Sequence, residues 1–203
     1  IFPSNIQGLP TWFEVRVSEK GYLGRREGVD IMVAMNAETL VEDVASISPG
    51  GYLLYDNSKP LAKALRRDEI AIPIASMMLP EFTDPKQRSL FKNIAYLGAL
   101  AGLLNIEFDV ITGMVSTQYK GKDALIQPNI RSLELGRDYA LNYLDAPLPL
   151  QVRRSDAVGD RIMIDGNDAA GLGSVYGGAT VCAWYPITPS TSVAESFENH
   201  SNV

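Results

Sequence analysis

The chain has 203 residues, of which 46% are hydrophobic and 21% charged, a composition typical of a soluble globular protein of one or two domains. Its formal charge of −6 at pH 7 argues against nucleic acid as a partner, because phosphate binding needs a basic face. Cys182 is the only cysteine, so this chain alone cannot build a disulfide, a zinc site or an iron–sulfur cluster.

No stretch of the sequence predicts a membrane span. The longest strongly apolar helical run, residues 94–104, has about half the length that a bilayer requires. The sequence contains no disulfide framework and nothing that resembles a signal peptide, which fits a reducing cytosol. We therefore expect a cytoplasmic protein that makes no membrane contact.

The N-terminal part of the chain alternates expected strands and helices. Residues 11–18 alternate apolar and polar side chains, which predicts a half-buried strand. Residues 29–35 form a nearly continuous apolar run and predict a buried strand, followed by Asn36 as an N-cap and a helix with apolar residues between 40 and 47. After a turn at residues 48–51, a strand, a short helix and a strand are expected at residues 52–55, 60–66 and 70–75. This alternation indicates βαβ units and a mostly parallel sheet.

Three longer helices are expected next. The first begins at Asp84 and Pro85 and extends to about Asn105, and its Gly98 and Gly102 allow a neighbour to approach closely. Two more cover about residues 109–118 and 125–144. The predicted fold class is α/β, with a mostly parallel sheet followed by a helical part.

A proline-rich and charged stretch at residues 146–160 reads as a linker between domains 1–145 and 161–203. After it we expect a strand at 161–164, a turn at 166–168, a helix at 169–176 ended by a glycine pair, and a strand at 180–184. Gly171 and Gly173 are interpreted as packing glycines, because Tyr176 stands where a dinucleotide fingerprint needs its third glycine. Two strands and two helices cannot bury a core, so we expect this domain to continue in a longer chain or to be completed by another polypeptide.

The candidate site is the turn at residues 185–191, which leads from the expected strand into a helix. Pro189 suits the first helical turn with Thr188 as N-cap, or Ser192 and Glu195 form a capping box instead. Either arrangement puts hydroxyl groups at a helix N-terminus, where backbone N–H groups and the helix dipole favour an anion. The alternative is that these hydroxyls only cap the helix. His200, the only histidine, lies in a polar tail and is assigned no role.

Two sets of residues resemble the 2-oxoacid:ferredoxin oxidoreductases. Residues 166–170 (Gly-Asn-Asp-Ala-Ala) with 183–191 (Ala-Trp-Tyr-Pro-Ile-Thr-Pro-Ser-Thr) look like the start of the family's thiamin-pyrimidine-binding, or alpha, domain. Residues 3–8, 15–18, 29–36 and 93–98 resemble its small, Rossmann-like gamma domain. A gamma domain fused ahead of an alpha domain is typical of the 2-oxoglutarate-type enzymes. The glycine-rich unit that usually opens the gamma domain is missing, and Gly8-Leu9 replaces a glycine pair.

The resemblance implies a thiamin-diphosphate-dependent enzyme that decarboxylates a 2-oxoacid to an acyl-coenzyme A and passes electrons to ferredoxin. The 2-oxoacid that it implies is 2-oxoglutarate. Thiamin diphosphate with its magnesium ion would be held mostly by a beta subunit, and the iron–sulfur cluster by a partner subunit, in a hetero-oligomer. The implied catalytic and substrate-binding residue is Thr188, with Ser190 as a second substrate contact and a cofactor wall made of Tyr185, Pro186, Ile187 and Pro189. No residue is assigned to a metal, and Glu195 and Glu198 are not assigned the glutamate that activates thiamin.

The sequence also permits a function of a different class. In this alternative, the chain is a noncatalytic assembly module whose surfaces only dock a catalytic partner subunit. The apolar surface expected on an incomplete second domain motivates this alternative. It would be abandoned if the isolated chain proved monomeric and bound no partner.

Overall fold

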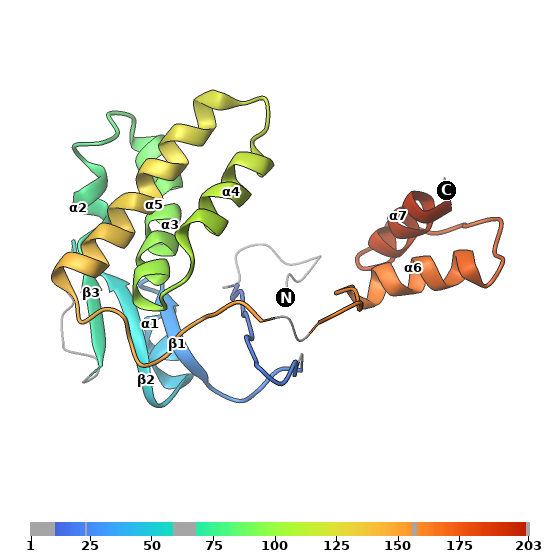
Figure 1. Cartoon of the computed structure of the whole chain (residues 1–203), viewed down its shortest axis with the longest axis horizontal. Coiled ribbons are helices and arrows are strands. Elements are labelled where there is room, and N and C mark those ends of the chain that lie inside the picture. Colours follow the sequence, from blue (N-terminus) through green and yellow to red (C-terminus); the bar gives the residue numbers. More distant parts are fainter. Residues whose placement is uncertain (1–10, 23, 59–67, 156–157, 202–203) are drawn as a thin grey trace. The chain divides into compact units, whose positions relative to one another are not determined.

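The computed structural model describes residues 11–22, 24–58, 68–155 and 158–201. Two compact units form, one of residues 22–154 with 16–18 and the other of the residues from 155 onward with short stretches of the N-terminal segment. The helix expected at 60–66 and the family-like segment at 3–8 lie outside the described residues. Figure 1 shows the order of the elements in each unit.

The larger unit contains a three-stranded parallel sheet in the order β1-β2-β3. The strands are β1 (Val29–Ala34), β2 (Ile47–Asp56) and β3 (Glu69–Ile72), and α1 (Leu40–Ala45) connects the first two. Helices α2 (Ile74–Met78), α3 (Pro85–Leu103), α4 (Phe108–Gln118) and α5 (Asp123–Tyr143) follow. The predicted α/β class with a parallel sheet and a helical part is confirmed.

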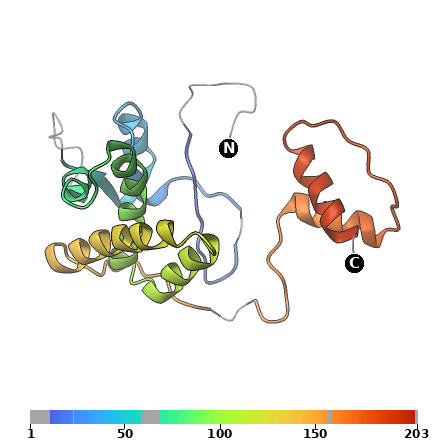
Figure 2. The same cartoon turned by 90° about the horizontal axis from the view of Figure 1, so that it is seen from above.

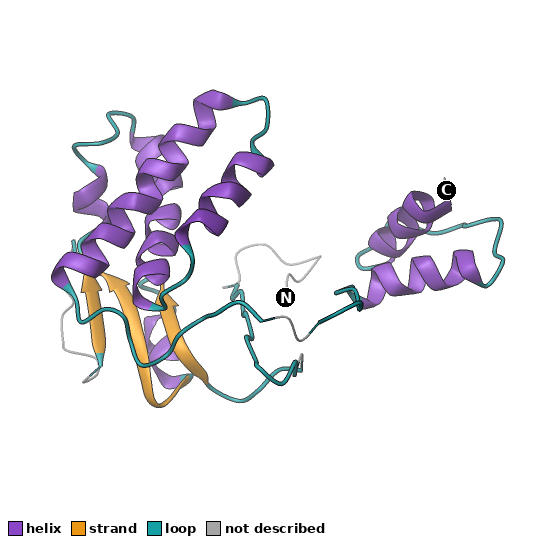
Figure 3. Cartoon of the chain, viewed as in Figure 1, coloured by secondary structure: helices purple, strands orange, loops and turns teal. Residues whose placement is uncertain are grey.

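The sheet is the middle of three layers, as Figure 3 shows for the orange strands and purple helices. Adjacent side chains of β2 point to opposite faces, as the period of a strand requires. Leu53 packs with Ala34 and Ile47 on the face covered by α1, whereas Leu54 belongs to the main core under α2, α3 and α5. Both leucines are fully buried, so the segment of β2 around them is covered on both faces of the sheet.

Helices α3 and α5 approach each other through glycines. A methyl group added at Gly98 would lie 2.0 Å from the carbonyl oxygen of Leu133, and one added at Gly136 would lie 1.9 Å from that of Ala95. The sequence predicted the close approach at Gly98 and also at Gly102, where an added carbon would lie 3.1 Å from the Cβ of Ala140. The role of Gly136 was not predicted.

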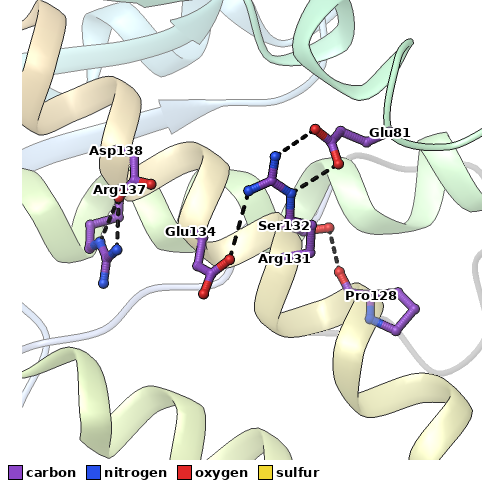
Figure 4. Close-up of polar contacts among 7 residues, drawn as sticks. All are labelled: Glu81, Pro128, Arg131, Ser132, Glu134, Arg137 and Asp138. Atoms are coloured by element: carbon purple, nitrogen blue, oxygen red, sulfur yellow. Dashed lines mark hydrogen bonds and ion pairs between the residues drawn. The ribbon is translucent and has the colours of Figure 1, made fainter.

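A polar network on α5 connects that helix to the segment before α3. The Arg131 guanidinium donates through two nitrogens to the carboxylate of Glu81, at 2.9 and 2.7 Å, and also lies 3.8 Å from Glu134 (Figure 4). These charge-assisted hydrogen bonds, with the positive charge, hold the pKa of Glu81 below its usual range. Ser132 of the same helix is buried, and its hydroxyl donates to the carbonyl of Pro128 at 2.8 Å.

Asp56 ends β2 and joins the sheet to the helices. Its carboxylate accepts from the backbone N–H groups of Ser58 and Ala75 and forms an ion pair with Lys92 of α3 at 3.2 Å. Burial alone would raise the pKa of Asp56, but these contacts together outweigh it and lower that pKa. The phenol of Tyr96 on α3 has a raised pKa because of burial and the nearby charge of Asp56.

Several boundary predictions in the larger unit are wrong. The predicted turn at 48–51 is a bulge inside β2. Between two successive aligned pairs, β1 advances by two residues and β2 by five. Gly50 there has φ +77°, and a side chain on Gly51 would collide with the carbonyl oxygen of Asp30. Ile47 belongs to β2 and not to the preceding helix, and β3 ends at Ile72 because Pro73 precedes α2.

Three predicted strands are absent from the described residues, at 11–18, 161–164 and 180–184. Although residues 11–18 alternate apolar and polar side chains, Phe13 and Val15 are exposed. A strand is stable only when another strand satisfies its backbone groups, so an apolar or alternating pattern alone does not form one. For the same reason Cys182, expected inside an apolar strand, is exposed.

Candidate functional site

The smaller unit is built on two helices, α6 (Gly166–Tyr176) and α7 (Ser190–Ser201). Asp165 caps α6 by accepting from the N–H of Asp168 at 2.8 Å, so the helix begins earlier than the predicted residue 169. Gly177 caps its other end and Gly178 follows at φ +84°, which confirms the predicted glycine stop.

The two helices lie side by side and run in the same direction. The amide of Asn167 donates to the hydroxyl of Ser192 at 2.8 Å, and further along each helix Gly171 lies against Ser196. The connection 177–189 therefore returns along the pair to the starting end, as Figure 2 shows for this unit. Both helix N-termini consequently lie at one end, next to the turn that precedes α7.

Gly171 sets how closely the helices pack. A methyl group added there would lie 2.5 Å from the Oγ and 2.6 Å from the Cβ of Ser196, whereas one added at Gly173 would meet nothing within 4 Å. The interpretation as a packing glycine is thus confirmed for Gly171 and is wrong for Gly173, which faces open space.

A short polar chain joins the helices beside Gly171. The Ser196 hydroxyl donates to the carboxylate of Asp168, and the Nε2 of His200 lies 3.3 Å from the same carboxylate. The hydrogen bond from Ser196, followed by the contact with His200, lowers the pKa of Asp168. His200 is thus a half-buried contact between helices and not an exposed tail residue.

Backbone and hydroxyl hydrogen bonds close the turn before α7. The Ile187 N–H donates to the Tyr185 carbonyl at 2.8 Å, and the Ser190 N–H donates to the Ile187 carbonyl at 2.7 Å. The Ser190 hydroxyl donates to both of these carbonyls, at 2.8 and 2.6 Å. The peptide bond between Thr188 and Pro189, which lies within this turn, is cis.

The six residues that the sequence singled out share this turn and its helix start. Tyr185 and Ile187 are 76% and 51% exposed, and Pro186, Thr188 and Pro189 are exposed as well. Among the residues that the structure describes, none hydrogen bonds to the hydroxyl of Thr188. That hydroxyl is therefore available to an external acceptor, whereas the hydroxyl hydrogen of Ser190 is already shared between two carbonyls.

The capping alternatives are resolved by where α7 begins. Because Ser190 is the first helical residue, Pro189 precedes the helix and Ser192 lies inside its first turn. The Ser192 hydroxyl donates back to the Pro189 carbonyl at 2.8 Å, so it does not form the capping box with Glu195. The first turn of α7 contains no acidic residue, which leaves its positive dipole end without a carboxylate of its own helix.

Sequence reasoning missed the residues that hold α7 against α6. Asn167, Asp168 and Ser196 stood in or beside recognised segments, but no spacing rule links contacts between two helices 25 or more residues apart. Only the Asp165 cap had a local signal. An aspartate that accepts a hydrogen bond from the backbone N–H three residues later commonly marks the start of a helix. In the described ranges, no three His, Cys, Asp or Glu side chains gather as metal ligands would.

Comparison with known proteins shows that the chain is similar to one class of enzyme. The chain is 24% identical to the alpha subunit of 2-oxoacid:ferredoxin oxidoreductase 2 from Aeropyrum pernix, over 100% of this chain and 38% of that subunit. It is 23% identical to the alpha subunit of 2-oxoacid:ferredoxin oxidoreductase 1 from Sulfurisphaera tokodaii, over 98% of this chain and 37% of that subunit. The chain thus spans less than two fifths of the length of these relatives.

A solved structure agrees with these relatives. The fold matches that of 2-oxoglutarate:ferredoxin oxidoreductase from Magnetococcus marinus, solved with 2-oxoglutarate, coenzyme A and succinyl-CoA bound, with a TM-score of 0.70 and 28% identity. The match covers 85% of this chain and 30% of that one. Residues 1–139 match the family model described as pyruvate ferredoxin/flavodoxin oxidoreductase, and the chain belongs to that family.

None of the helices in the described part of the chain has the length and apolarity of a membrane span.

Proposed function

We propose that the chain is part of the alpha subunit of a 2-oxoacid:ferredoxin oxidoreductase, in which the turn at 185–190 forms one wall of the site for the 2-oxoacid. The observation that carries the proposal is an exposed, locally closed turn that presents the Thr188 hydroxyl at the N-terminus of α7. Family membership and the named relatives support the reaction class. By the same resemblance, 2-oxoglutarate is the proposed substrate and ferredoxin the proposed electron acceptor.

The residues of the turn suit a wall beside a cofactor. The exposed faces of Tyr185 and Ile187 supply apolar surface, and the cyclic side chains of Pro186 and Pro189 add no N–H donors. When bound, thiamin diphosphate would supply the electron sink for decarboxylation. The chain offers this group a wall, so we propose that a beta subunit holds the diphosphate with its magnesium ion, and that a partner subunit holds the iron–sulfur cluster.

The chemistry assigned to this chain is positioning and charge stabilisation. Thr188 would donate a hydrogen bond to the carboxylate or carbonyl oxygen of the 2-oxoacid, and the N-terminus of α7 would favour that negative charge. Tyr185 and Ile187 would exclude water from the reacting end of the substrate. The substrate contact predicted for Ser190 stays a prediction.

The test uses the complex that contains this chain. We expect it to reduce a viologen dye only when a 2-oxoacid and coenzyme A are both present. Thr188→Val should lower kcat/KM about 10- to 100-fold, because one hydrogen bond to developing charge is lost while the side-chain volume is kept. The matched control is Thr117→Val, which removes an exposed hydroxyl that donates to the Gly113 carbonyl within α4. Equal activity of wild type and Thr188→Val would remove Thr188 from the site.

A noncatalytic assembly module is the second candidate. The smaller unit exposes large apolar side chains outside the turn, with Met163 at 85%, Tyr176 at 86% and Val181 at 81%. Such surface favours docking onto another polypeptide. If this candidate is right, the complex needs the chain for assembly, yet no substitution in the turn changes turnover.

A further inference from the structure

We propose that Ser190 is a positioning residue that fixes the direction of the Thr188 side chain, and this inference rests on the proposed function. Ser190 does so through its own hydrogen bonds to the backbone of the turn. It makes three of them, one from its N–H and two from its hydroxyl, and all three end on carbonyls of residues 185 and 187. These carbonyls lie on the N-terminal side of Thr188, whereas Ser190 lies on its C-terminal side.

The geometry makes these hydrogen bonds a closure around Thr188. Ser190 and Ile187 flank Thr188 and Pro189, so a bond between them limits rotation about the backbone of the two enclosed residues. The second hydroxyl bond, to Tyr185, extends the closure to the start of the turn. The side chain of Thr188 follows its own backbone, so its direction depends on that closure.

The hydroxyl of Ser190 cannot easily serve both this closure and a substrate. A serine hydroxyl has one hydrogen to donate, and here the two carbonyls share it. Donation to a substrate carboxylate would require leaving both carbonyls without that partner. The hydrogen bonds therefore favour an indirect role, in which Ser190 orients the turn and Thr188 touches the substrate.

The first test measures how well the backbone amides of the turn are protected from hydrogen exchange. In the assembled complex without substrate, Ser190→Ala should increase hydrogen exchange of the Ile187 and Ser190 amides by about tenfold, the effect of roughly one lost hydrogen bond. Ser190→Thr keeps the hydroxyl and should restore protection. Ser174→Ala is the matched control, because the Ser174 hydroxyl donates to the Ala170 carbonyl within α6 at 2.8 Å and is remote from the turn.

The second test separates an indirect role from direct contact with the substrate. Ser190→Ala should lower kcat/KM for the 2-oxoacid about tenfold in the wild-type background and by much less in a Thr188→Val background, since residues acting through one contact are not additive. Additive losses would overturn the proposal and assign Ser190 its own substrate contact. Wild-type exchange rates in Ser190→Ala would also overturn it.

The two tests fail in different ways. If the wild-type complex reduces no dye with any 2-oxoacid, the proposed function fails, and the exchange experiment alone decides whether Ser190 holds the turn. If the complex is active and Ser190→Ala matches wild type in either test, the inference fails and the proposed function stands.

Discussion

The contact between α3 and α5 allows a sharp prediction about the fold. In Gly98→Ala, the new methyl carbon would start 2.0 Å from the carbonyl oxygen of Leu133, and real side-chain carbons essentially never come closer than 3.0 Å. The helices must therefore separate locally by about 1 Å, since both sides of the contact are backbone and neither can rotate away. This separation loosens the buried contacts of Ala95 and Ala99, which are fully buried.

The magnitude follows from two opposing effects. Overpacking a close-packed core costs about 1–3 kcal/mol, and the backbone-to-backbone contact puts this case at the upper end. Replacing a helical glycine by alanine stabilises the helix by up to about 1 kcal/mol, because alanine has the higher helix propensity. We therefore expect Gly98→Ala to lower the free energy of unfolding by about 2 kcal/mol or more.

The matched control is Gly113→Ala in α4, where an added carbon would meet nothing within 4 Å. It receives the propensity gain without the collision, so it should raise the free energy of unfolding by about 0.5–1 kcal/mol. Urea denaturation with linear extrapolation measures both variants under the same conditions. If Gly98→Ala were as stable as Gly113→Ala, the close approach of α3 and α5 would be refuted.

Two further predictions concern the sheet and the smaller unit. Asp56→Asn should lower the free energy of unfolding at pH 7. The pKa of Asp56 is lowered in the folded state. The contribution of its carboxylate to stability is therefore complete above the unfolded pKa of about 3.9 and is lost as pH falls through the folded pKa. The difference between wild type and variant should thus shrink below about pH 4, and a constant difference in acid titrations of stability would contradict this. Gly171→Ala should push α6 from Ser196 and increase hydrogen exchange in α7, whereas Gly173→Ala, which faces open space on the same helix, should leave α7 unchanged.

The sequence predicted the elements that carry their own periodic or capping signal. The helix after Asp84 is one example, because the aspartate accepts from the N–H of Lys86 and Pro85 occupies the first turn. The strand at Val29–Ala34 is another, since a loop precedes its apolar run, although Ala34 is the one buried residue of this strand. In both cases the information is local, so residues close in sequence decide the structure.

Prediction from the sequence failed where a contact between residues far apart in the chain decides the structure. Residues 11–18 and 180–184 have the patterns of strands but form no strand in the structure, because strand pairing depends on a neighbour that the pattern does not specify. Gly136 was missed since its reason is the backbone of Ala95, about forty residues away. The site shows the same division: its residues were recognised from a local string, whereas their mutual hydrogen bonds became visible only in the structure.

The packing of the smaller unit and the proposed site are connected through one chain of contacts. Gly171 lets α7 lie against α6, and the bond from Asn167 to Ser192 fixes the N-terminal turn of α7 on that neighbour. Ser190, the first residue of α7, then holds the turn that carries Thr188. Each step orders the next, so the direction of the Thr188 hydroxyl depends on helix packing as well as on its own turn. A substitution at Gly171 should therefore disturb the site although Gly171 itself lies outside it.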